Sequence, residues 1–185
     1  MLDAEQFIGL SAVSARSALI VVGVFTFMIV EARRAARNER AQHARGGVEP
    51  EGDVYSMMQV TYPGVFLAMI LEGALRQSSS SDALFAVGLL LFAAAKALKW
   101  WAIITLGSYW TFRIIVVPGT VAIRSGPYRF LSHPNYVAVV GEIVSVALMT
   151  GARVAGPVSL LVFGALMLRR IAVENRALDA ILRRG

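Results

Sequence analysis

Residues 10–30 read LSAVSARSALIVVGVFTFMIV, an apolar run in which Arg16 is the only charged side chain. A helix needs about 20 mainly apolar residues to cross the hydrocarbon core of a bilayer, so this length is typical of a transmembrane helix. Similar segments recur along the chain, and the expected spans are 10–30, 55–75, 83–106, 135–150 and 154–168. The sequence therefore predicts an all-α integral membrane protein of about five helices, with residues 1–185 forming a single membrane domain.

The segments between the spans refine this expectation. The first half of the polar stretch 31–53 has the composition to continue the first helix into water, until Gly46, Gly47 and Pro50 interrupt it. The last two spans are short and joined by GARVAGP, residues 151–157, which favours a C-terminal helical hairpin. The segment 107–134, between the third and fourth spans, is a polar and aromatic connector.

The composition excludes several classes of protein. With 57% hydrophobic residues and a mean hydropathy of +0.63, the chain is too apolar for an ordinary water-soluble domain. The lack of cysteine rules out disulfides, thiolate metal sites and a cysteine nucleophile. The histidines, His43 and His133, are too few for a histidine-rich di-iron site, so no metal is expected. No GxGxxG word follows a strand-like run, so a Rossmann dinucleotide site is not expected.

The basic residues predict an orientation and argue against a nucleic-acid partner. The net charge is +6, but the arginines gather at the ends of apolar segments and form no basic face interleaved with aromatics. Cytoplasmic flanks of membrane helices are enriched in Lys and Arg. The side that holds Arg33–Arg45 also holds Arg113, Arg124, Arg129, Arg169, Arg170, Arg176, Arg183 and Arg184, against Arg16, Arg76 and Arg153 opposite. We therefore expect, in a cell inner or plasma membrane, an outer N-terminus and a cytoplasmic C-terminus and connector.

The stretch SGPYRFLSHPNY, residues 125–136, is the richest part of the connector. Gly126-Pro127 predicts a turn, and Pro134 restricts His133 to an extended conformation and begins the fourth helix. The free N–H groups of that first helical turn can receive a carboxylate or hydroxyl of a ligand, beside the rings of Tyr128 and Tyr136. The alternative is an interfacial belt, in which Tyr and Arg side chains sit at headgroup depth without binding a ligand.

Two further groups of charged residues stand out. Glu142 falls inside the fourth span, where an unpaired charge is costly, and Lys96 and Lys99 in the third span are its candidate partners. In LRRIAVENRALDAI, residues 168–181, Arg170 and Glu174 share one helical face. That pair is either an intrahelical ion pair on a basic flank or a functional pair folded back against the connector.

Three words in the C-terminal half resemble the isoprenylcysteine carboxyl methyltransferase family of integral-membrane enzymes. They are LGSYWTFRIIVVPG (106–119), VAIRSGPYRFLSHPNY (121–136) and RIAVENRAL (170–178), with the predicted hairpin between the second and third. The resemblance implies transfer of a methyl group from S-adenosylmethionine, bound at the cytoplasmic face in a pocket formed within about 106–185, to an acceptor that arrives through the bilayer.

The same resemblance implies roles for individual residues. Arg170 corresponds to an arginine that meets the acceptor, and Glu174 to a carboxylate near the cofactor. Arg113 aligns roughly with a further cofactor position but differs in residue type. The implied cofactor-binding residues are Thr120, Val121, Ala122, Ile123, Tyr128, His133, Pro134, Asn135, Tyr136 and Glu174. The chain departs from the family pattern at Ser132, where Arg is usual, and at Asn175, where a second Glu is usual.

The expected function is O-methylation of a lipophilic acceptor. LGSYWTFRIIVVPG and HPNYVAVVGE are similar to a bacterial branch associated with lipidic polyketides such as alkylpyrones, so the acceptor is expected to be a lipophilic small molecule of prenyl or polyketide type. Its reacting oxygen would belong to a carboxylate, an acidic enol or a phenol. Two alternatives stay open: an NADPH-dependent sterol- or enone-reductase-like enzyme, and a non-enzymatic membrane scaffold or transporter subunit.

Overall fold

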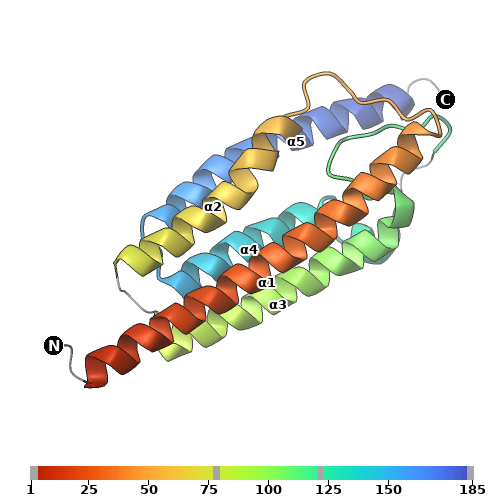
Figure 1. The fold of residues 1–185 in the computed structure, drawn as a ribbon. Coiled ribbons are helices and arrows are strands. Elements are labelled where there is room, and N and C mark those ends of the chain that lie inside the picture. The colour runs from red at the N-terminus through yellow and green to blue at the C-terminus, as the bar shows by residue number, and fades with distance from the viewer. Residues whose placement is uncertain (1–3, 77–79, 121–122, 183–185) are drawn as a thin grey trace.

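The fold is a bundle of long helices, given by a computed structural model that describes residues 4–76, 80–120 and 123–182 (Figure 1). Its helices are α1 (Ala4–His43), α2 (Tyr55–Leu75), α3 (Asp82–Leu106), α4 (Pro134–Thr150) and α5 (Ala155–Leu182), with short 3-10 helices η1 (Gly107–Tyr109) and η2 (Gly126–Arg129) in the connector. Within the described ranges, the only β-type pairing is the isolated antiparallel bridge between Val48 and Val116. The prediction of an all-α protein is confirmed.

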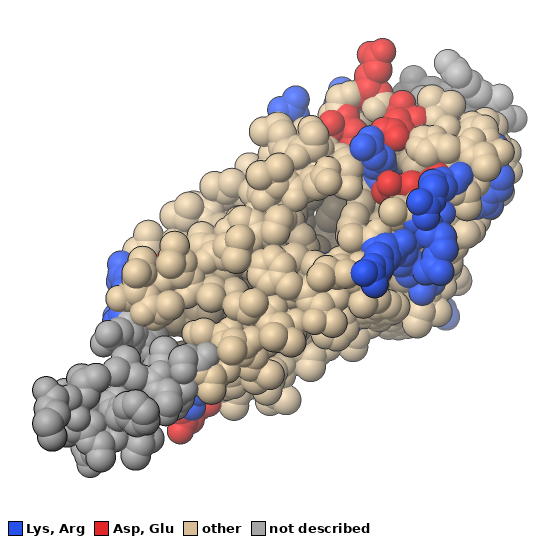
Figure 2. Space-filling view, viewed as in Figure 1, with Lys and Arg blue, Asp and Glu red and all other residues tan. Residues whose placement is uncertain are grey.

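Four of these helices are long and apolar enough to cross a membrane, and α4, with 17 residues, is shorter. The chain is therefore an integral membrane protein, and Figure 2 shows a broad uncharged surface between its ends. Two helices exceed the predicted spans. α1 continues to His43, as the composition of 31–53 allowed, and α5 continues as one helix to Leu182 instead of ending near residue 168.

Small residues let α3 and α4 approach closely. A Cβ atom added to Gly141 of α4 would lie 3.0 Å from the Cβ of Ala95 in α3, and one added to Gly88 would lie 2.7 Å from Cγ of Met149. Lipid tails are as apolar as leucine, so close contact between small residues is a main source of helix association in membranes. This packing fixes α4, and with it the N-terminus of α4 beside the connector.

The expected C-terminal hairpin is present. α4 ends at Gly151, which adopts the left-handed conformation (φ 65°) that glycine tolerates best, and α5 begins at Ala155. Glu72, near the end of α2, accepts hydrogen bonds from the backbone N–H groups of Val154 (3.1 Å) and Ala155 (2.5 Å). A carboxylate at a helix N-terminus satisfies free N–H groups and complements the helix dipole. Glu72 therefore ties the start of α5 to α2.

Four charged side chains form a buried ion network in the middle of the bundle: Glu31 of α1, Lys96 and Lys99 of α3, and Glu142 of α4. Lys96 Nζ lies 2.8 Å from Glu31 and 2.9 Å from Glu142, and Lys99 Nζ lies 2.7 Å and 3.4 Å from the same carboxylates. The predicted partnership of Glu142 with both lysines is confirmed. Glu31, at the edge of the first predicted span, is the partner that the sequence did not reveal.

Removing one charge from this network should destabilise the bundle. We expect Glu142→Gln to lower the free energy of unfolding by about 3–5 kcal/mol, because two buried lysines then share one carboxylate. The measurement is denaturant unfolding of the protein in mixed micelles, followed by circular dichroism. The matched control is Asp82→Asn, since Asp82 is exposed and its pair with Arg16 is worth at most about 1 kcal/mol. The prediction is contradicted if both variants lower the free energy of unfolding by the same amount.

Candidate active site

The part of α1 that continues beyond the first predicted span, as far as His43, holds the connector against the end of the bundle. Asn38 Nδ2 donates to the carbonyl oxygens of Gly107 (3.0 Å) and Trp110 (2.7 Å). One turn further along, Gln42 Nε2 donates to the carbonyl of Ser108 (3.1 Å). Between them, Glu39 accepts from the backbone N–H of Phe112 (3.2 Å). A polar helix face thus satisfies backbone groups in and just after η1, where the connector has little regular secondary structure.

A cavity of about 490 Å³ lies where the connector, the N-terminus of α4 and the C-terminal half of α5 meet, within the range of small-molecule sites. Figure 2 shows a hollow in the uncharged surface beside a group of charged side chains. The walls also include apolar side chains from the membrane-spanning parts of α1 and α2, such as Phe25, Ile29 and Pro63. The cavity therefore extends from polar side chains near the connector to apolar side chains of the membrane-spanning helices α1 and α2.

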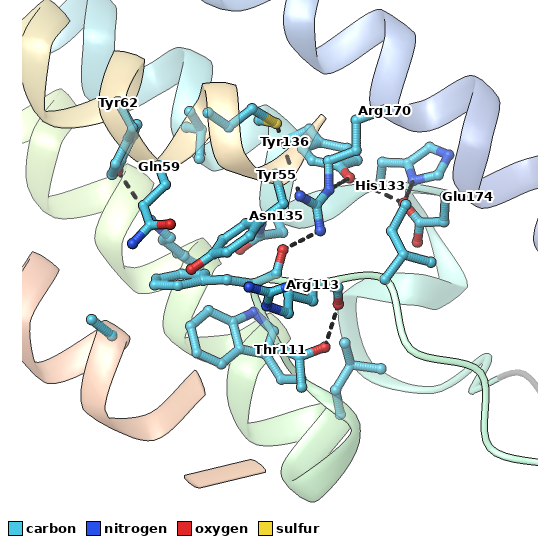
Figure 3. A pocket seen from close by; sticks show the side chains of 18 of the residues that line it. Tyr55, Gln59, Tyr62, Thr111, Arg113, His133, Asn135, Tyr136, Arg170 and Glu174 are labelled. Carbon is cyan, nitrogen blue, oxygen red and sulfur yellow. Dashed lines mark hydrogen bonds and ion pairs between the residues drawn. The ribbon is translucent and has the colours of Figure 1, made fainter. Parts of the chain in front are cut away.

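Arg170 occupies the polar end and is almost fully buried (Figure 3). Its Nε donates to the hydroxyl of Tyr136 at 3.0 Å, and its Nη2 donates to the backbone carbonyl of Phe112 in the connector. Its Nη1 lies 3.5 Å from Oδ1 of Asp53, in the loop before α2. Of the two interpretations of the Arg170–Glu174 pair, the structure agrees with folding against the connector, because Arg170 forms its ion pair with Asp53.

Glu174 lies one turn further along α5 and faces the N-terminus of α4. Its Oε2 accepts a hydrogen bond from the Tyr136 hydroxyl (3.1 Å) and lies 3.7 Å from Nδ1 of His133. The rings of His133 and Tyr136 are neighbours, with centroids 5.5 Å apart. Pro134 is the first residue of α4, as the sequence predicted, and His133 is its N-cap residue. One carboxylate therefore gathers a histidine and a tyrosine at the start of a helix.

Two further predicted residues line the cavity. Tyr128, in η2, has its phenol pKa raised well above the ordinary value, first by burial and then by the negative charge of Glu174, so it stays a neutral hydroxyl. Asn135 presents a buried side-chain oxygen that has no hydrogen-bond partner among the described residues. A buried polar atom without a partner is rare in native proteins, and this one belongs to a residue that lines the cavity.

Other predicted positions lie away from the cavity. Pro134 is buried in the α4 cap, and Thr120 and Ile123 lie outside the cavity wall. Thr120 donates its backbone N–H to the carbonyl of Val117, and neither Thr120 nor Ile123 belongs to a helix or strand. Val121 and Ala122 lie outside the described residues. The family departures, Ser132 and Asn175, are both exposed and do not line the cavity.

Arg113, which aligns roughly with a further cofactor position of the family, belongs to the connector and lines the cavity. It pairs with Glu49 at 2.8 Å and lies over the ring of Tyr55, 4.7 Å from its centroid. The hydrogen bond and negative charge of Glu49 raise the pKa of the Arg113 guanidinium above its ordinary value. Arg113 therefore links the loop before α2 to the connector.

Sequence reasoning missed the contribution of that loop and of α2. Asp53 anchors Arg170 and also accepts from the backbone N–H groups of Tyr55 (3.1 Å) and Ile114 (3.2 Å). The available signal was an acidic residue immediately before the second span. Tyr62, inside that span, also lines the cavity. The sequence carried no signal for it, because it lies among the apolar residues of a membrane helix.

Comparison with known proteins gives a family for the C-terminal half of the chain. Residues 86–180 match the Isoprenylcysteine carboxyl methyltransferase (ICMT) family, over a region that includes α4, the connector and both Arg170 and Glu174. The chain belongs to the isoprenylcysteine carboxyl methyltransferase family. Family membership makes the protein a membrane methyltransferase.

Two relatives of this ICMT-family chain are bacterial. It is similar to the uncharacterized protein YpbQ of Bacillus subtilis, with 29% identity over 78% of this chain and 86% of that protein. It is also similar to an uncharacterized protein of Haemophilus influenzae, with 25% identity over 77% of this chain and 83% of the relative. No solved structure matches the chain significantly.

The contacts of Asp53 lead to a test of how the site is held. We expect Asp53→Ala to accelerate amide hydrogen exchange in the segment 112–114 by about 10- to 100-fold, because charge-assisted hydrogen bonds contribute about 1.5–3 kcal/mol each. Exchange is followed by mass spectrometry of the protein in detergent. Glu49→Gln is the matched control, because its carboxylate is exposed and pairs with Arg113 at the surface. If Glu49→Gln has the same effect as Asp53→Ala, the anchoring role of Asp53 is wrong.

Proposed function

We propose that the protein transfers a methyl group from S-adenosylmethionine to an oxygen of a lipophilic acceptor. The observation that carries the proposal is the convergence of Arg170, Tyr136, His133 and Glu174 on one cavity whose other end is apolar and at the level of the membrane. The acceptor oxygen belongs to a carboxylate or to an acidic enol or phenol. Such a group is anionic or easily becomes so, and an arginine orients it well.

The residues of the polar end suit the methyl donor. The carboxylate of Glu174 can pair with the amino group of S-adenosylmethionine. The positive end of the α4 helix dipole can bind the carboxylate of S-adenosylmethionine. The unpartnered oxygen of Asn135 can accept a hydrogen bond from it, and the rings of Tyr128 and Tyr136 can face its cation. When bound, S-adenosylmethionine supplies a methyl group activated by a positively charged sulfur.

Arg170 holds the acceptor anion in this mechanism. A guanidinium carries five N–H donors, and the contacts with Tyr136 and Phe112 leave an N–H of Nη2 available for the acceptor. Asp53, whose Oδ1 lies 3.5 Å from Nη1, partly neutralises the positive charge of Arg170. A moderate contact is useful, because the acceptor oxygen loses its negative charge as it gains the methyl group and a tight hold would favour the ground state.

Alignment and exclusion of water supply the rest of the rate enhancement. The buried positions of Arg170 and Tyr136 fix the acceptor with little freedom, and holding two reactants in a near-attack pose contributes about 7–11 kcal/mol. The apolar walls from α1 and α2 allow a lipophilic acceptor to reach the site from the bilayer.

The orientation proposed is an outer N-terminus with the site at the cytoplasmic face. Basic residues gather at the end of the bundle that carries the connector and the C-terminal half of α5, as Figure 2 shows for one face. The positive-inside rule supports a cytoplasmic position for that end.

The first test is ligand binding. S-adenosylhomocysteine should bind the purified protein in isothermal titration calorimetry, whereas NADPH should not. Glu174→Gln should weaken that binding by about 10- to 100-fold, since it removes a charged hydrogen-bonding partner. Asn175→Ala, one residue further along and exposed, is the control and should bind as the unsubstituted protein does. Binding of NADPH in place of S-adenosylhomocysteine would instead indicate a reductase.

The second test is turnover. Protein incubated with methyl-labelled S-adenosylmethionine and bacterial lipid extracts should label a lipophilic product. Arg170→Ala and His133→Ala should each reduce labelling by at least about 100-fold, because each removes a polar group from the wall of the reaction site. Arg169→Ala removes the exposed neighbouring arginine and should keep full activity. Full activity of either cavity variant would refute the role of that residue.

A further inference from the structure

The buried ion network reaches the cavity at Lys99 and at Tyr62, a tyrosine bonded to the network, and both side chains line the cavity. Tyr62 of α2 donates its hydroxyl proton to Oε2 of Glu142 and accepts a hydrogen bond from Lys99 Nζ at 3.2 Å. Glu31 and Lys96 complete the set of charged groups behind it, from α1 and α3. From α5 it meets the ring of Phe163, with centroids 5.3 Å apart. The mechanism above uses none of these charged groups.

The Tyr62 hydroxyl has one hydrogen-bonding position left. A phenol carries one proton and two lone pairs. The proton is directed to Glu142 and one lone pair receives Lys99, so the other lone pair has no partner among the described residues. Tyr62 therefore presents a hydrogen-bond acceptor to a partner that carries an O–H or N–H group.

Beyond its two charged partners, the acceptor lies among apolar side chains, deeper than Arg170. The ring of Phe163 packs against the Tyr62 ring, and Met28 and Val139 also line the cavity. Arg170 contacts Met58 Sδ at 3.9 Å, and Tyr62 follows Met58 by four residues, or about 6 Å along the helix. Figure 3 shows Tyr62 and Arg170 on opposite sides of the cavity. A molecule held by Arg170 would extend its body toward Tyr62.

We propose that Tyr62 binds a hydroxyl group on the body of the lipophilic acceptor, at a point separate from the oxygen that receives the methyl group. The inference rests on the proposed function for the identity of the ligand. It defines the substrate class as an oxygenated lipid with an acidic head and a second hydrogen-bond donor. A hydroxyl group at this position gains one hydrogen bond with the second lone pair of Tyr62, whereas a plain hydrocarbon chain gains none.

The test compares hexadecanoic acid with hexadecanoic acids that carry one hydroxyl at successive chain positions. Binding is measured by calorimetry on protein in lipid nanodiscs. Isomers within a narrow window of positions should bind about 3- to 10-fold more tightly than the plain acid, as expected for one net hydrogen bond. Tyr62→Phe should remove this preference and leave the affinity for hexadecanoic acid unchanged. Tyr55→Phe, which removes the hydroxyl of another cavity tyrosine, should keep the preference.

Each outcome decides the inference. It is wrong if no isomer binds more tightly than hexadecanoic acid, or if Tyr62→Phe keeps the preference. If Tyr62→Phe does not fold, infrared difference spectra of ring-labelled tyrosine protein in the Tyr55→Phe background replace it. The tyrosine C–O band should then shift with the preferred isomer and not with hexadecanoic acid, and an unchanged band overturns the inference. S-adenosylhomocysteine binding, measured on the same samples, reports separately on the proposed function.

Discussion

Glu31, Lys96, Lys99 and Glu142 have almost no contact with solvent, and this shared burial constrains how α1, α3 and α4 can pack. Any arrangement that separates these helices leaves a charge unpaired inside a bilayer, which is much more costly than exchanging one apolar contact for another. Packing against lipid tails discriminates weakly between registers, because the tails are as apolar as the side chains. The ion network therefore specifies a register that leucine and valine could not specify alone.

The position of the candidate active site follows from that register along α1. Glu31, Ala35 and Gln42 are buried on one face of the helix, and Asn38 lies between them on the same face. The face begins in the ion network and ends under the connector, which it holds through side-chain hydrogen bonds to backbone groups. A continuous helix thus couples the middle of the bundle to the loop that supplies Phe112 to Arg170.

The sequence predicted features that depend on neighbours in the chain. Apolar runs located the helices, and Pro134 itself indicated where the fourth helix begins. The sequence could not predict contacts between elements far apart along the chain, such as Asp53 with Arg170 or Glu31 with Lys96. Helical periodicity carries no information on which helix faces meet.

The single-helix character of α5 links the chemistry to the bilayer itself. Glu72 holds the start of this helix, and Arg170 lies 15 residues after Ala155, about 22 Å along a rigid rod. Helices adjust to a thicker or thinner bilayer by tilting. A tilt about the Glu72 end would swing Arg170 relative to the connector, which is anchored separately to α1. The thickness of the host membrane is thereby a physical variable of the reaction geometry.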